Sequence, residues 1–299
     1  MPDDLYNQLD EIRKLVIISL FSDDTLMELF TLKGGNALNY IYDVSARSSI
    51  DIDISMAESF KEYKLAMEEV SATLEYVLSS TFEENGYYIF DISLEERPQV
   101  THENFWGGYQ LNFKLLDYET WSKLKEEGKE LEDFQRQAIP INEQNHRNFK
   151  VDISKYEYTK NRIAHELDYY TIYVYTPLMI VYEKLRSICQ QMEEYKKIIP
   201  THSVKGRAKD FFDIYTLMDK HTIKFLDENN LNILKEIFLI KKVPLSFLKL
   251  LEDQREFHRD SFTTVIDTIN PEIELQEYDY YFDYVLEITK NILKVLGIK

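Results

Sequence analysis

The chain has 299 residues, of which 44% are hydrophobic and 14% aromatic, so it can bury a sizeable core and is not an intrinsically disordered protein. Its single cysteine, Cys189, excludes an intrachain disulfide framework and is typical of a reducing compartment. The net charge of −18 excludes a protein that grips nucleic acid over its whole surface, because such a surface is normally basic. Any contact with a polynucleotide must therefore be local.

The N-terminal residues and the apolar runs of the sequence indicate where the protein is expected to act. The first residues are acidic and polar, unlike a secretory signal, and no uninterrupted apolar run approaches about 20 residues. We therefore expect a cytoplasmic protein with no membrane partner.

A glycine pair follows the first predicted elements. Residues 4–21 have apolar side chains at helical spacing, residues 30–32 resemble the end of a short strand, and residues 36–42 again have helical spacing. Gly34 and Gly35 lie at this strand-to-helix junction. Glycines there let backbone N–H groups approach an anion, and a helix N-terminus favours negative charge. The junction is a candidate phosphate site.

The next strand carries two carboxylates. Residues 50–54 alternate between isoleucine and aspartate, which places Asp51 and Asp53 on the face opposite the isoleucines, with Ser49 on the same side. Paired carboxylates repel each other unless a cation lies between them, and Mg²⁺ prefers oxygen ligands. Taken alone, this motif is more often a solvated strand face. The glycine pair, helix and aspartate strand in this order are more specific.

The middle of the chain contributes a third candidate carboxylate. We expect a helix over 60–82, strands over 87–93 and 109–115, an irregular segment over 95–108, and a charged helix over 119–138. Residues 149–154 alternate again, with Asp152 on the polar face. If this strand lies beside residues 50–54, Asp152 faces the same metal position. The alternative is an exposed aspartate at a strand end.

The C-terminal part is predicted to be helical. A helix begins after Thr176 as its cap, with Lys184 and Glu183 beside its apolar stripe and Arg186 pointing elsewhere. Residues 196–209 are the densest cationic stretch and could contact a triphosphate or polyanion, although basic loops are also common on protein surfaces. Another helix follows, and Asp210 and Asp213 share one of its faces. Further helices are expected over 224–241, 244–257, 259–268 and 277–297.

Four ordered segments carry a family resemblance. KGGNAL with RSSIDID, then KVDIS, then EKL, then RAKDFFD resemble the AbiEii/AbiGii nucleotidyltransferase toxins, a branch of the polymerase-β-like superfamily. The resemblance covers roughly residues 30–217. It implies an α+β fold in which residues 1–170 form a nucleotidyltransferase domain, a mixed sheet with flanking helices. Residues 171–299 form a helical domain that contributes Lys184 and Asp210 to the site.

The resemblance also implies roles for individual residues. Those that would hold the nucleotide are Gly34, Gly35, Ser49, Lys184, Arg207 and Lys209. The implied metal ligands, for Mg²⁺ or Mn²⁺, are Asp51, Asp53 and Asp152, and the implied catalytic set is these three with Lys184 and Asp210. Asn36 departs from the family pattern, in which a small hydroxyl residue is common, and the second aspartate of the last segment, Asp213, is expected to be structural.

The implied activity is transfer of a nucleotide from an NTP to RNA, such as a tRNA 3′ end. The implied context is a bacterial type IV toxin–antitoxin or phage-defence pair with a separate repressor protein as antitoxin. The acidic charge leaves a second interpretation open, in which the acceptor is a protein or a small molecule such as an antibiotic. A third interpretation is an inactive member that only binds nucleotide or a partner.

Overall fold

A mixed seven-stranded sheet is the centre of the computed structural model, which describes residues 3–44, 51–99, 103–142, 144–270 and 273–298. The strand order is β3-β4-β5-β2-β1-β7-β6. The strands are β1 (Thr31–Lys33), β2 (Ile52–Ser55), β3 (Tyr87–Arg97), β4 (Gly108–Asp117), β5 (Phe149–Ser154), β6 (Ile163–Leu167) and β7 (Tyr170–Val174). β2 runs parallel to β5 and antiparallel to β1, so the two strands with predicted aspartates are neighbours.

The alternation of apolar and polar residues in the sequence explains why each central strand has one buried face and one polar face. In β5, Phe149, Val151 and Ile153 are buried while Lys150 is exposed. In β2, Ile52 and Ile54 are buried, so the polar side chains of both strands share the opposite face.

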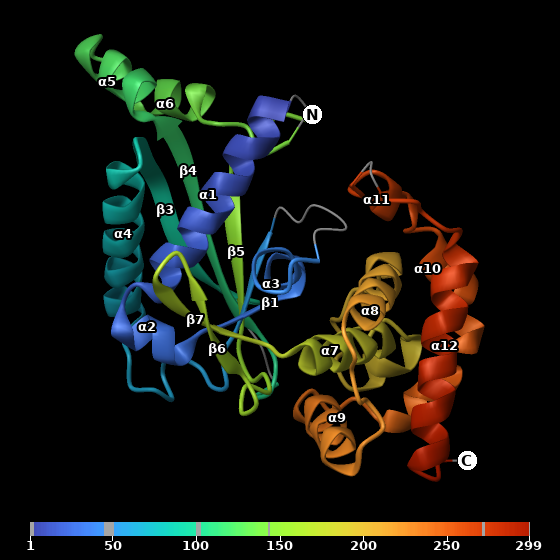
Figure 1. Ribbon diagram of the computed structural model, residues 1–299. Helices are drawn as coiled ribbons and strands as arrows, with labels where there is room; N and C mark the ends of the chain where they lie inside the picture. The colour runs from blue at the N-terminus through green and yellow to red at the C-terminus, as the bar shows by residue number, and fades with distance from the viewer. Residues whose placement is uncertain (1–2, 45–50, 100–102, 143, 271–272, 299) are drawn as a thin grey trace.

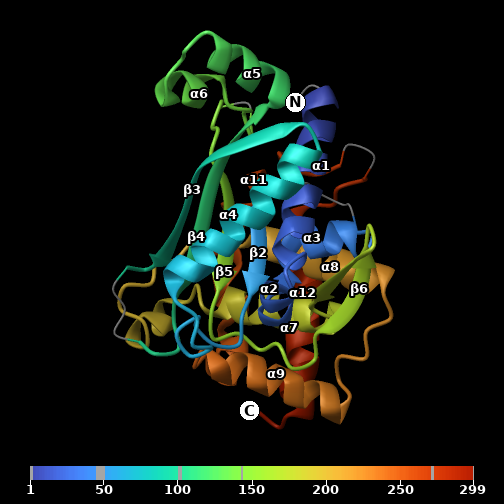
Figure 2. The ribbon, with the colours of Figure 1, turned by 90° about the vertical axis from the view of Figure 1, so that its left-hand side faces the viewer.

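Four helices from the first third of the chain pack against this sheet (Figures 1 and 2). They are α1 (Asp3–Phe21), α2 (Asp24–Leu29), α3 (Gly34–Tyr40) and α4 (Met67–Glu84). The predicted start of α4 at residue 60 is wrong. Lys64 has a φ of +62° and interrupts any helix there, while the buried Phe60 stacks on Tyr109 at a centroid distance of 4.2 Å.

The charged segment after β4 forms two helices instead of the predicted one. These are α5 (Tyr118–Glu126) and α6 (Leu131–Gln137), which project from one end of the sheet (Figure 1). Gly128 lies between them with a φ of +67°, a conformation that ends α5 and reverses the chain. Trp121 and Phe134 of the two helices pack on Tyr88 of β3.

Two strands differ from the sequence expectation. β3 continues to Arg97, through an irregular register between Phe90 and Ser93, so only residues 98–107 separate it from β4. β6 was not predicted at all. Four of its five residues are exposed, so it has no alternating buried face that the sequence could reveal.

The remaining chain is helical and lies beside the sheet (Figure 1). Its helices are α7 (Pro177–Cys189), α8 (Ala208–Lys220), α9 (Glu228–Ile240), α10 (Arg255–Arg259), α11 (Thr263–Ile266) and α12 (Tyr278–Val295), with 3₁₀ turns η1 (Glu193–Lys197), η2 (Leu245–Leu250) and η3 (Glu252–Gln254). Thr176 caps α7 as expected, since its hydroxyl accepts a hydrogen bond from the Met179 N–H at 3.2 Å. The predicted helices over 244–257 and 259–268 are instead short helical turns.

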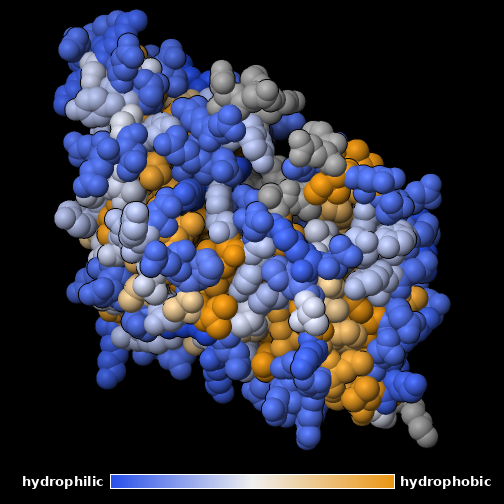
Figure 3. Space-filling view, in the orientation of Figure 1, coloured by the Kyte–Doolittle hydropathy of each residue, from blue (hydrophilic) through white to orange (hydrophobic). Residues whose placement is uncertain are grey.

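The predicted fold class is confirmed, with a mixed sheet, flanking helices and helices at the C-terminal end. The division into residues 1–170 and 171–299 stays a prediction, and most of β7 lies beyond that boundary although it pairs with β1. On the face shown in Figure 3, hydrophobic side chains appear over the C-terminal helices. Leu239 of α9 and Val295 of α12 are exposed. Among the described residues, none of the helices is both long and apolar enough to cross a membrane.

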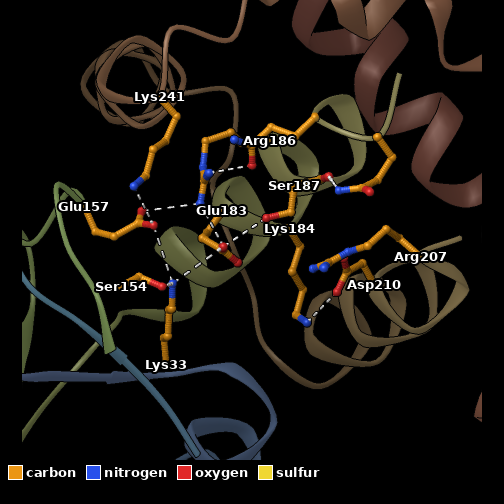
Figure 4. Close-up of polar contacts among 12 residues, drawn as sticks. Lys33, Ser154, Glu157, Glu183, Lys184, Arg186, Ser187, Arg207, Asp210 and Lys241 are labelled. Carbon is orange, nitrogen blue, oxygen red and sulfur yellow. Dashed lines mark hydrogen bonds and ion pairs between the residues drawn. The ribbon is translucent and has the colours of Figure 1, made fainter. Parts of the chain in front are cut away.

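A buried carboxylate joins the sheet to the C-terminal helices (Figure 4). Glu157 follows β5, and its oxygens lie 3.3 Å from Arg186 of α7, 3.3 Å from Lys241 after α9 and 3.7 Å from Lys33 of β1. Burial alone would raise the pKa of Glu157, but these three cations lower it to about 2. Glu157 is therefore ionised and holds together charges from both parts of the chain.

We expect Glu157→Gln to lower the free energy of unfolding by about 3–5 kcal/mol, because it leaves buried cations without their counter-charge. Urea denaturation at neutral pH measures this change. Glu132→Gln is the control, since that side chain is 82% exposed and its loss should stay within about 0.5 kcal/mol. Equal effects of the two substitutions would contradict a stabilising role for the Glu157 cluster.

Candidate active site

A pocket of about 680 Å³ lies between the sheet and the C-terminal helices. The nine predicted site residues that the structure describes all line it: Gly34, Gly35, Asp51, Asp53, Asp152, Lys184, Arg207, Lys209 and Asp210. The tenth, Ser49, lies outside the described residues. Segments separated by up to about 170 residues of chain thus meet in one cavity, which is large enough for a nucleotide.

The glycine turn forms one wall of the pocket. Gly34 begins α3 with a φ of +70°, which L-amino acids with a side chain rarely adopt. A Cβ atom placed on Gly34 would lie 2.3 Å from Oδ2 of Asp53. The aspartate strand therefore packs directly against the turn, and only glycine leaves room for the Asp53 carboxylate.

Asn36 holds the beginning of the aspartate strand. It is buried, and its side-chain amide donates a 2.7 Å hydrogen bond to the carbonyl oxygen of Asp51. The bond fixes the backbone next to the first carboxylate. This contact is a structural reason for asparagine at a position where the resemblance implies a small hydroxyl residue.

Strand register brings the carboxylates together. Asp53 and Asp152 are direct partners in the parallel pairing of β2 and β5, and Asp51 lies two residues before Asp53 at the exposed end. Gln110 of β4 donates a 3.1 Å hydrogen bond to Oδ1 of Asp152. The strand of Asp152 therefore lies beside β2, and the role of Asp152 as a metal ligand stays a prediction.

These carboxylates affect each other's ionisation. Burial raises the pKa of Asp53 to about 6, with Lys33 opposing the shift and the charges of Asp152, Glu183 and Asp51 adding to it. Burial and Asp152 likewise raise the pKa of Asp51, against the lowering effect of nearby lysines. The group repels additional negative charge and would be relieved by a cation.

The donor chemistry fits a hard divalent cation, because carboxylate oxygens are the ligands that Mg²⁺ and Mn²⁺ prefer. As the side chains stand, no three Asp, Glu, His or Cys residues within the described ranges are arranged to ligate one ion. The observation that favours a cation here is that burial, with the charges of neighbouring carboxylates adding to it, raises the pKa of Asp53.

The opposite wall belongs to α7 and α8. The Lys184 ammonium donates to Asp210 at 3.0 Å and to Asp213 at 2.6 Å, and all three residues are buried. Arg207 contacts the other oxygen of Asp210. Burial alone would raise the pKa of Asp210, but Arg207 and Lys184 lower it. Asp210 is thus an ionised bridge between two cations that line the pocket.

Sequence reasoning missed several pocket residues. Lys33 is buried on β1 opposite Asp53, with its ammonium 3.4 Å from the Ser154 hydroxyl and 3.9 Å from Glu183. Arg186 was predicted to point elsewhere than Lys184 and Glu183, but it is buried, lines the same pocket and pairs with Glu183 at 2.9 Å. Lys33 directly precedes the glycine pair in the sequence. Its role could not be predicted, because the residues that its ammonium contacts lie more than 100 residues away along the chain.

A glycine turn, three carboxylates and cations of the facing helices thus meet in one pocket. A family model described as the nucleotidyl transferase AbiEii toxin of a type IV TA system matches residues 17–284. The chain belongs to this family and is a nucleotidyltransferase toxin of the toxin–antitoxin type.

Two solved structures from Helicobacter pylori are similar to the chain. One was described as a candidate nucleotidyltransferase, with 12% identity, a TM-score of 0.49 and coverage of 100% of this chain and 99% of its own. The other, JHP933, has 14% identity, a TM-score of 0.49 and coverage of 99% and 95%. No curated protein is significantly similar. The family assignment rests on the family match.

We expect Gly34→Ala to reduce pyrophosphate release from NTP by at least about 100-fold, because the added Cβ atom displaces Asp53. Gly128→Ala is a matched control. Gly128 also has a positive φ, at +67°, but a Cβ atom added there would meet nothing within 4 Å. Both variants should lose about 1 kcal/mol of stability from backbone strain, and only the first should lose activity. Similar activity in the two would show that the contact with Asp53 does not matter.

The raised pKa of Asp53 makes a prediction about stability. Its folded-state pKa of about 6 lies above the ordinary aspartate value of 3.8, so its favourable contribution is present below pH 3.8 and is lost as pH rises through about 6. In a metal-free buffer at pH 7.5, Asp53→Asn should therefore be more stable than the natural protein by on the order of 2–3 kcal/mol. The difference should shrink toward pH 4 in urea titrations. A destabilised variant at pH 7.5 would refute the electrostatic cost assigned to Asp53.

Proposed function

We propose that the protein uses Mg²⁺ or Mn²⁺ to transfer a nucleotide from an NTP to RNA. The observation that carries this proposal is that one pocket has Asp51, Asp53 and Asp152 on the sheet side and more cations than carboxylates on the helix side. A triphosphate carries negative charge, which the cations attract, and it can share a divalent cation with the carboxylates.

The transfer proceeds by attack of an acceptor hydroxyl oxygen on the α-phosphorus of the NTP. A new oxygen–phosphorus bond forms, the bond to the β-phosphate oxygen breaks, and pyrophosphate leaves. Asp51, Asp53 and Asp152 would hold the cation, which lowers the charge developing on the phosphate oxygens. Asp152 would complete the metal site or, alternatively, accept the proton that the acceptor hydroxyl loses.

The protein's own cations would bind the triphosphate. Lys184 and Arg207 are fixed against Asp210, so they offer oriented positive charge without having to reorganise during the reaction. Lys209 lies on the same wall. The glycine turn at the start of α3 would let the backbone of Gly34 and Gly35 approach a phosphate closely.

Local charge supports RNA as the acceptor. Lys150, Lys205 and Lys209 all act electrostatically on Asp51, at the exposed end of the carboxylate group. This cationic rim lies in a chain of net charge −18, so positive charge is concentrated where a polynucleotide would meet the reacting groups. We further propose that the toxin acts in the cytoplasm, with a tRNA 3′ end as a candidate acceptor and a separate repressor as its antitoxin.

Incubation of the protein with Mg²⁺, each labelled NTP and total cellular RNA tests this function. We expect label on RNA from one NTP, and none with the double variant Asp51→Ala/Asp53→Ala. Label on protein, or pyrophosphate release without labelled RNA, would favour a protein or small-molecule acceptor. Nucleotide binding without either signal would favour a protein that only binds nucleotide.

The cationic rim makes a separate prediction. Lys150→Gln should weaken RNA binding and reduce the slope of log affinity against log salt concentration by about 1, because one phosphate contact is lost. Lys123→Gln, a substitution on the distant α5, should leave both unchanged. Filter binding at several salt concentrations measures both. An unchanged slope for Lys150→Gln would place the RNA elsewhere.

A further inference from the structure

The loop that leads into α8 is held by residues from much later in the chain. The backbone N–H of Arg207 donates a 3.1 Å hydrogen bond to Nδ1 of His258, and the N–H of Ala208 donates a 2.9 Å bond to the hydroxyl of Ser261. His258 belongs to α10, and Ser261 lies between α10 and α11. These contacts join segments that are about fifty residues apart.

Helix α8 has no cap of its own. The residue before it, Arg207, makes no side-chain capping bond, and its φ of −128° and ψ of 36° are not helical. The first N–H groups of a helix need acceptors from outside its own ladder. His258 and Ser261 supply two such acceptors, so the start of α8 is fixed by tertiary contacts.

The loop also lies tightly against Ser261. A Cβ atom on Gly206 would come within 2.5 Å of the Ser261 hydroxyl oxygen, so the backbone there approaches as closely as glycine allows. The hydroxyl itself donates to the carbonyl of His258 at 2.9 Å, which fixes its orientation. Ser261 further lines the pocket.

The supporting segment is itself anchored. Arg255 and Arg259 of α10 pair with Asp279 of α12 at 2.7 and 2.8 Å. The His258 ring is buried and packs on Phe211 of α8 at a centroid distance of 5.2 Å. Since Nδ1 accepts a hydrogen bond, the ring is neutral and carries its proton on Nε2.

We propose that His258 and Ser261 are positioning residues for the nucleotide. By holding the backbone of residues 206–208, they keep Arg207 against Asp210 and keep Lys205, Arg207 and Lys209 turned into the pocket. This inference rests on the proposed function, in which those cations bind the triphosphate. It assigns to the C-terminal helices a part in substrate binding that goes beyond packing.

Calorimetric titration of the full chain with each NTP, in Ca²⁺ to prevent turnover, tests the inference. Ser261→Ala and His258→Leu each remove one acceptor and should weaken NTP binding roughly tenfold. His258→Asn should largely restore it, because the asparagine oxygen can accept the bond that Nδ1 accepted. Thr268→Ala removes a hydroxyl that bonds only within the same segment and should bind as the natural protein does.

Thermal unfolding shows which variants are folded, and Ser261→Ala removes so little that it tests the inference even if His258→Leu does not fold. Unchanged NTP binding by Ser261→Ala would overturn the inference. Equal weakening by Thr268→Ala or His258→Asn would also overturn it, because the role would then be only structural. Arg207→Ala tests the proposed triphosphate-binding role of the loop separately from the positioning role of His258 and Ser261. If Arg207→Ala binds NTP normally, the proposed role of the loop fails, and the inference fails with it.

Discussion

The burial of closely spaced carboxylates on adjacent strands is the constraint on which this site depends. The parallel register of β2 and β5 places Asp53 beside Asp152, and the strand period places Asp51 on the same face. Burial raises the pKa of Asp53 to about 6, and the neighbouring carboxylates add to this shift while Lys33 opposes it. A sheet built in this way keeps an electrostatic cost that binding of a cation would relieve, which is typical of a functional site rather than of a stabilising one.

The rest of the pocket distributes positive charge around that group. Lys33 lies on the neighbouring strand, while Lys184 and Arg207 approach from the helices. Each of these cations already contacts a carboxylate of the protein, so each is oriented before any substrate arrives. Preorganised charge of this kind stabilises phosphoryl transfer without reorganisation during the step. The Glu157 cluster keeps the two walls in a fixed relation.

Local periodicity predicted the central strands and placed the aspartates on their polar faces, while the family resemblance singled these aspartates out as site residues. Alternation over residues 149–154 predicted Asp152, because one face of β5 is buried and the other lines the site. The same reasoning failed for β6, whose residues are mostly exposed, and for α5 and α6, where Gly128 breaks a continuous charged pattern. The fold class therefore agrees with what short patterns and family resemblance indicated. Nine of the ten predicted site residues line one pocket, which agrees with their predicted closeness.

Contacts between distant segments were beyond such reasoning. Nothing near Glu157 in the sequence indicates that Arg186 and Lys241 will surround it. Likewise, His258 and Ser261 lie in a region for which the sequence predicts only helices. They accept hydrogen bonds from Arg207 and Ala208, so their contacts depend on where α8 begins. Ion pairs and caps of this kind are set by tertiary structure, for which a single sequence carries little signal.

The most direct test of the central claim is a crystal structure with Mn²⁺ and a non-hydrolysable NTP analogue, with the anomalous signal of manganese used to locate the ion. We expect the manganese peak among Asp51, Asp53 and Asp152, with the triphosphate between it and Lys184 and Arg207. Manganese bound away from these carboxylates, or a triphosphate outside the pocket, would contradict the assignment of this pocket as the nucleotidyl-transfer site.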